Sequence, residues 1–238
     1  MARPQRWGYD LVRSPVRSQL DHTPLTLSAL TPRPIPEIAA AARAVQANVV
    51  ALRTNWCKRI AEEPAAHDIR TPSPGAISAQ RELLIDWRVI RDFSNEELAL
   101  RLRQVWGEFC ALCWLFPFVD PQKPIDFGQL SPNQSLRCCQ DVHQKIEQVQ
   151  TGLWRMKHEQ RLRLDGTKDL SLQREHEIAM TTPFKVYNVS VSQCSDEDLL
   201  CCACEYAGML AALRWASDNR WAWEAPGIME ITASSLDP

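Results

Sequence analysis

The sequence predicts a mainly α-helical fold, an irregular bundle of about five helices with one short β element and an extended N-terminal arm. Hydrophobic residues make up 45% of the 238 residues, which is enough for a sizeable core. In several segments the apolar residues recur every three or four positions, the spacing that places them on one face of a helix. Most of these segments also begin with serine or proline, which favour the start of a helix.

Proline and arginine set the N-terminal part of the chain apart. Residues 1–35 are expected to form the extended arm, because Pro32, Pro34 and Pro36 exclude a regular helix there. Residues 36–238 are expected to form a single helical domain. Its elements should be, in order, a helix from Pro36 to about residue 61, a loop over 63–77, a helix over 78–91, a helix from Ser94 to Phe116, a long helix over 132–164, a short strand over 184–191 and a last helix over 196–217.

Two helix starts carry clear signals. Ser94 is followed three residues later by Glu97, the spacing of a capping box in which each side chain bonds the backbone of the other. Ser131 followed by Pro132 predicts the start of the longest helix, because serine caps well and proline suits the first helical position.

Composition limits the class of protein. The formal net charge is −2, so the chain as a whole is neither strongly basic nor strongly acidic. The longest apolar run, Phe109–Val119, is too short to span a bilayer, and the first residues lack an apolar signal sequence. With nine cysteines and no such signal, we expect a reducing cytoplasm, free or metal-bound thiols and no membrane contact.

Two Cys-x-x-Cys pairs, one beginning at Cys110 and one at Cys201, could form a metal site or could belong to the packed core. Residues three apart share one face of a helix, so four thiols would converge if the two helices touched. Such a set could ligate zinc or an iron–sulfur cluster. Packing is the favoured interpretation, because Cys204, Gly208 and Ala212 form a stripe of small residues that lets another helix approach closely. The candidate metal ligands are Cys110, Cys113, Cys201 and Cys204.

Arginine and lysine gather in the arm and near the end of the long helix. Cations in such places can bind phosphates, and they can equally complement the helix dipole without any ligand. A nucleic-acid interface is therefore an alternative function, and it predicts binding that weakens strongly with salt. Its candidate residues are Arg3, Arg6, Arg13, Arg17, Arg155, Lys157, Arg161 and Arg163.

A thiol enzyme is the third alternative. Cys139, His143 and Glu147 follow one another at intervals of four on one helix face, as a nucleophile, a base and an orienting carboxylate would. One imidazole would have to reach back one turn and forward one turn at once, whereas working triads draw their members from different elements. We therefore do not assign a catalytic residue.

The function that these observations favour is non-catalytic. Nine tryptophans, the extended arm and the long helix are typical of a subunit or adaptor in a larger intracellular protein or nucleoprotein assembly. Phosphate-binding glycine loops and the common hydrolase motifs do not occur in the sequence. Protein partners are expected, and no cofactor is required by this interpretation.

Overall fold

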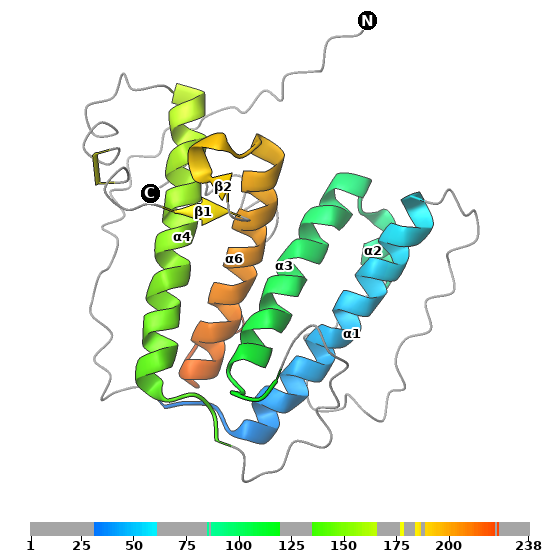
Figure 1. Ribbon diagram of the computed structural model, residues 1–238. Helices are drawn as coiled ribbons and strands as arrows, with labels where there is room; N and C mark the ends of the chain where they lie inside the picture. The colour runs from blue at the N-terminus through cyan, green and yellow to red at the C-terminus, as the bar shows by residue number, and fades with distance from the viewer. Residues whose placement is uncertain are drawn as a thin grey trace, which may run out of the picture.

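The computed structural model describes residues 31–60, 85, 87–119, 135–165, 177–178, 184–186, 189–221 and 223. Four long helices dominate this part of the chain and confirm the mainly α-helical fold (Figure 1). They are α1 (Ile35–Ile60), α3 (Asn95–Trp114), α4 (Cys139–Asp165) and α6 (Asp196–Ser217).

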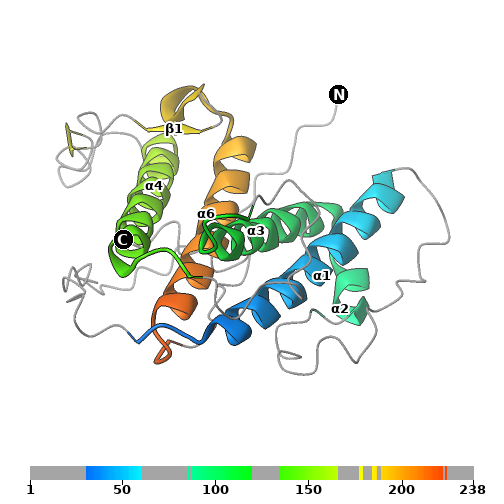
Figure 2. The same cartoon turned by 60° about the horizontal axis from the view of Figure 1, so that its bottom comes forward.

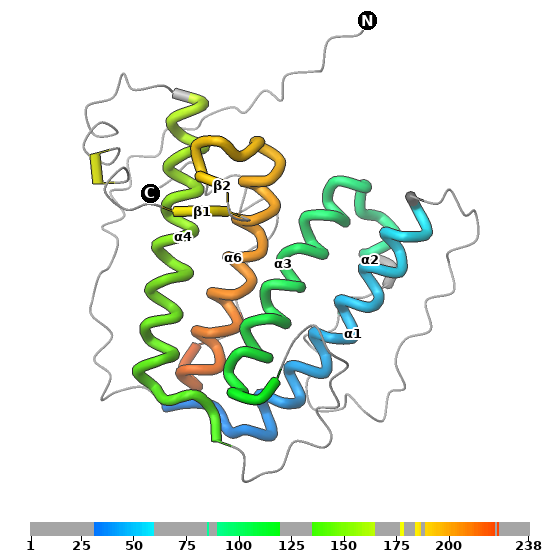
Figure 3. The backbone as a smooth tube through the Cα atoms, viewed as in Figure 1, coloured from blue at the N-terminus to red at the C-terminus, as the bar shows by residue number. Residues whose placement is uncertain are grey.

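The helices lie side by side in the order α4, α6, α3, α1, so that α6 and α3 occupy the middle (Figures 1 and 3). The most extensive contact is between α3 and α6, which run in the same direction, while α1 and α4 run the opposite way on the two flanks. By length and composition alone α6 is apolar enough to cross a membrane, but most of it is buried as a central helix of this bundle.

The short elements lie at the ends of the long helices. The six-residue helix α2 (Trp87–Asp92) precedes α3 and packs on α1. Strands β1 (Lys185–Val186) and β2 (Val189–Ser190) pair antiparallel, with Lys185 opposite Ser190, and the 3-10 turn η6 (Val191–Gln193) follows them. The hairpin confirms the predicted β element. The predicted loop over 63–77 lies outside the described residues.

Serine caps begin both central helices. At the start of α3 the Ser94 side chain accepts from the Glu97 amide at 3.1 Å, and the Glu97 carboxylate accepts from the Ser94 amide at 2.7 Å. The predicted capping box is therefore confirmed. At α6 the Ser195 hydroxyl accepts from the Asp198 amide at 3.0 Å, so the first turn of each helix has a partner for one of its free donors.

The predicted start of the long helix is wrong. Residues 135–138 are not helical, and α4 begins at Cys139. The backbone amide of Arg137 donates instead to the Leu115 carbonyl at 2.9 Å, and its guanidinium donates to the Trp114 carbonyl at 2.6 Å. These carbonyls end α3 and lack partners within their own helix. The segment thus caps α3. Ser131 and Pro132 favour a local helix start, but they give no information about this contact with the end of α3.

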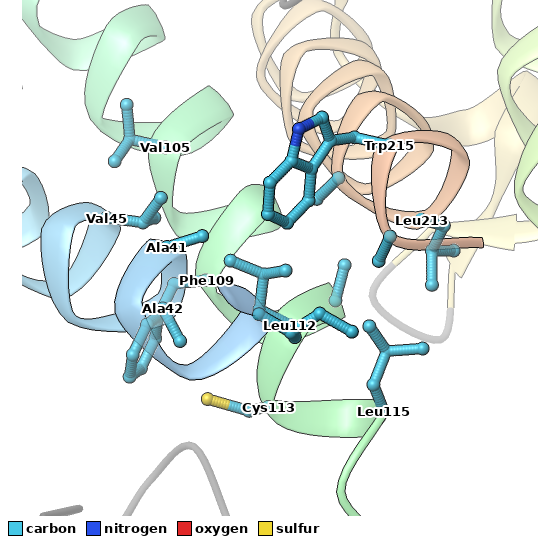
Figure 4. Close-up of a cluster of buried hydrophobic side chains, with 14 of the residues drawn as sticks. Ala41, Ala42, Val45, Val105, Phe109, Leu112, Cys113, Leu115, Leu213 and Trp215 are labelled. Atoms are coloured by element: carbon cyan, nitrogen blue, oxygen red, sulfur yellow. The ribbon is translucent and has the colours of Figure 1, made fainter. Parts of the chain in front are cut away.

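The core lies between α1, α3 and α6. Ala41 and Val45 of α1 face Val105 and Phe109 of α3, and Trp215 of α6 closes the same cluster (Figure 4). All five side chains are almost fully buried. Alanines on α1 let that helix lie close to the larger side chains of α3.

Residues 31–34, the end of the predicted arm, lie along the end of α6. The guanidinium of Arg33 donates to the Trp215 carbonyl at 2.9 Å and to the Trp221 carbonyl at 2.8 Å, and it stacks 4.5 Å above the centroid of the Trp215 ring. These bonds provide partners for carbonyls at and beyond the last turn of α6. Residues 1–30 of the arm lie outside the described part of the chain.

The contact between α3 and α6 brings backbone against backbone, where the two helices cross (Figure 2). A Cβ atom built on Gly107 would lie 1.9 Å from the backbone oxygen of Glu205. One built on Gly208 would lie 2.0 Å from the backbone oxygen of Gln104. Neither distance leaves room for a side chain, so the close approach predicted from the Cys204, Gly208 and Ala212 stripe occurs, and Gly107 completes it from the other helix.

Candidate functional site

The two Cys-x-x-Cys pairs lie on the helices that cross. Cys113 is buried in the core between α1 and α3, whereas Cys204 is buried in a separate cluster with Leu100 and Ala207. Cys110 and Cys201 are half-buried. Within the described ranges, no three His, Cys, Asp or Glu side chains are grouped so that they could hold a metal ion.

The chemistry of the buried thiols follows from their surroundings. All nine cysteines of the chain are free. Burial, with a contribution from the charge of Glu205, raises the pKa of Cys110 to about 12, and burial raises the pKa of Cys204 to about 12 and that of Cys113 further. These thiols are therefore protonated at neutral pH, and a protonated thiol is a poor nucleophile. The arrangement suits packing.

The predicted Cys139, His143 and Glu147 series is only partly assembled. Nε2 of His143 lies 3.2 Å from the Glu147 carboxylate, as the spacing predicts. Nδ1 of His143 is buried and has no hydrogen-bond partner among the described residues, so it does not engage the Cys139 thiol. Cys139 is exposed, because it is the first residue of α4.

The basic end of α4 is largely engaged within the protein. Arg155 is only 5% exposed, and burial lowers the pKa of the half-buried Lys157. Arg161 is half-buried. Arg163 donates to the Asp196 carboxylate at 2.6 Å and to the Glu159 carboxylate at 3.1 Å, which ties α4 to the start of α6. Arg3, Arg6, Arg13 and Arg17 lie outside the described residues, so the nucleic-acid interface stays a prediction.

An open groove of about 580 Å³ lies between α4, α6 and the start of the hairpin. Its apolar surface comes from Val149 of α4, Tyr206 and Met209 of α6, and Phe184 just before β1. Along the α4 side the groove is bordered by the exposed side chains of Gln144, Gln148 and Thr151. An apolar floor with a hydrogen-bonding border is the usual composition of a binding site.

Gly152 determines how the aromatic side of this groove is built. A Cβ atom at position 152 would lie 2.5 Å from Cε1 of Tyr206 and 2.8 Å from Cζ of Phe184. Because glycine leaves this space free, the two rings approach α4 and meet edge to face, with centroids 5.9 Å apart. The Phe184 carbonyl also accepts from the Val191 amide at 3.2 Å, which anchors the chain beside the ring.

The charges around the groove are balanced and have partners. Lys145 lies 5.8 Å from the centroid of the Trp114 ring, and Glu147 contacts His143. Both charged residues line the groove, one of each sign. The side chains that remain for hydrogen bonding along α4 are neutral amides and a hydroxyl, which carry both donors and acceptors.

The groove was not predicted from the sequence. Its walls come from three elements, and Phe184, Tyr206 and Met209 read individually as ordinary core residues. The available signal was Gly152, an unfavourable residue in the interior of a long helix. Such a glycine indicates a close approach by another group, but its partners lie 32 and 54 positions further along the chain.

Comparisons with protein-family models, with curated proteins and with solved structures found no match.

Proposed function

We propose that this protein is a non-catalytic subunit or adaptor of a larger intracellular protein assembly, and that it binds a segment of a partner protein in the groove between α4 and α6. The groove of about 580 Å³ is the observation that carries the proposal. Its volume falls in the range of known binding sites, roughly 300–1,000 Å³.

The lining supports a peptide segment as the occupant. Gln144, Gln148 and Thr151 lie on successive turns of α4, about 5.4 Å apart per turn. Side-chain amides and hydroxyls at this spacing can pair with the alternating donors and acceptors of a peptide backbone. The floor accepts an apolar side chain between Phe184 and Met209, and the flexible methionine adjusts to its shape.

The charge of the groove supports a protein partner over a nucleic acid. Phosphate backbones require several cations along one surface. Here Lys145 is accompanied by Glu147, and its ammonium already lies over the Trp114 ring. A neutral segment with apolar side chains therefore fits this lining better than a polyanion does.

An exposed aromatic side chain also lies just beyond the C-terminal end of α3. Phe118 follows the end of that helix and is 83% exposed, and the neighbouring Trp114 is half-buried. Aromatic side chains that lie exposed on a surface are enriched where proteins bind one another. The protonated thiols of the half-buried Cys110 and the buried Cys204 likewise support a packing role over catalysis.

Site-specific photo-cross-linking in the native host tests this proposal. A photoreactive residue at position 148 lies in the groove, and one at position 150 is its control, since Gln150 is also an exposed glutamine of α4 but does not line the groove. We expect a discrete protein adduct from position 148 and not from position 150. Equal adducts at both positions, or adducts with nucleic acid, would contradict the proposal.

The captured protein must then bind the purified full chain directly. Met209→Arg places a charge on the apolar floor and should weaken this binding by about tenfold or more. The control Gln150→Arg adds the same charge outside the groove and should leave the affinity within about twofold. Equal affinity for both variants would exclude the groove as the docking site.

A further inference from the structure

The α3–α6 crossing buries a carboxyl group. Glu108 is 3% exposed and lies on the face of α3 that meets α6. A Cβ atom built on Gly208 would lie 3.2 Å from its Cγ, so the side chain starts at the closest point between the two helices. Its Oε1 atom is buried and has no hydrogen-bond partner in the described part of the protein.

A buried carboxyl without a complete set of partners is much more stable neutral than ionised. Water cannot solvate it from the side of the crossing, because the space between Gly208 and the Gln104 carbonyl does not admit even a methyl group. Ionisation therefore requires the helices to separate or the charge to remain poorly solvated.

The charged groups around Glu108 do not make its ionised form the more stable one. On α3 itself Arg101 lies near, but its guanidinium donates to the side chain of Gln104. On α6 the groups at the crossing are the Cys204 thiol and the Glu205 carboxyl, which add no positive charge. On the other side, α1 presents alanines and Val45 to this part of α3 (Figure 4).

We propose that Glu108 is a pH-sensitive switch in the α3–α6 crossing: the crossing holds it as the neutral acid, and its ionisation as the pH rises through neutrality weakens the contact between the two central helices. A carboxyl at this place combines burial with an unfilled hydrogen-bonding position, which is what couples protonation to packing.

The direction of the effect follows from the two states of the carboxyl. Burial raises the pKa of Glu108 from 4.5 to about 7, and the charge of Arg101 opposes this shift only in part. The folded protein therefore binds the proton more tightly than the unfolded chain. The stabilisation from that proton is complete below pH 4.5 and is lost as the pH rises through about 7.

Urea unfolding of the full chain between pH 5 and pH 8 tests the switch. Glu108→Gln keeps the shape of the side chain and removes its titration. Over this range we expect the unfolding constant of the wild type to rise on the order of 50- to 100-fold more than that of Glu108→Gln. The control Glu96→Gln removes an exposed carboxylate from the first turn of the same helix and should follow the wild type.

A pH profile of Glu108→Gln that matches the wild type within about threefold would overturn the proposal. If this variant does not fold, carbon NMR of glutamate carboxyls in the wild type decides the question. One carboxyl should titrate with a midpoint near 7. Titration of all glutamates below about pH 5.5 would equally overturn it.

Discussion

The two faces of α6 are packed in different ways. Towards α3, glycines bring the backbones together, with Gly208 against the Gln104 carbonyl and Gly107 against the Glu205 carbonyl. Towards α4, Gly152 instead meets the ring edges of Tyr206 and Phe184, and an open groove of about 580 Å³ lies beside them.

The difference gives α6 one rigid contact, with α3, and one adaptable contact, with α4. Two backbones in direct contact cannot adjust without moving whole helices, because packed interiors hold little free space. The side chains of Tyr206, Phe184 and Met209 can change rotamer at small cost. The α3 side of α6 therefore fixes the bundle, while its α4 side can accommodate a ligand.

The largest expected effect is at the crossing. Gly208→Ala places a Cβ atom 2.0 Å from a backbone oxygen, so the helices must move apart. We expect a net loss of roughly 2–4 kcal/mol in the free energy of unfolding, even though alanine favours a helix more than glycine does. Urea unfolding measures it, and a stability equal to or above that of the wild type would show that the crossing is not rigid.

A smaller effect is expected on the other face of α6. Gly152→Ala places a Cβ atom 2.5 Å from the Tyr206 ring, which can swing away because it is a side chain. The gain in helix propensity offsets much of this cost, so we expect a net change within about 1 kcal/mol. The displaced rings should alter the near-UV circular dichroism. A loss of stability as large as that of Gly208→Ala would remove the distinction between the two faces.

Sequence patterns predicted the crossing because its determinants are periodic. The stripe of Cys204, Gly208 and Ala212 recurs every four residues, and only small side chains at that spacing leave a flat helix face. The capping box of Ser94 and Glu97 was found for a similar reason, since both its partners lie within one turn.

Features that depend on distant contacts were missed. The start of α4 depends on Arg137, which bonds to carbonyls more than 20 positions earlier in the chain. The burial of Arg155 and Glu108 likewise contradicts the usual exposure of charged residues. Such placements result from tertiary packing, which local propensity does not encode.

Native-state hydrogen exchange at constant pH tests the distinction between the two faces most directly. Amides at the crossing, in residues 104–108 and at Cys204, Glu205, Ala207 and Gly208, should exchange only through global unfolding and be the slowest in the protein. Amides of residues 144–151, along the groove, should exchange through local opening with a distinctly lower free energy. Equal protection of both sets, or slower exchange along the groove, would contradict the view that the α3–α6 contact is rigid and the α4–α6 contact is adaptable.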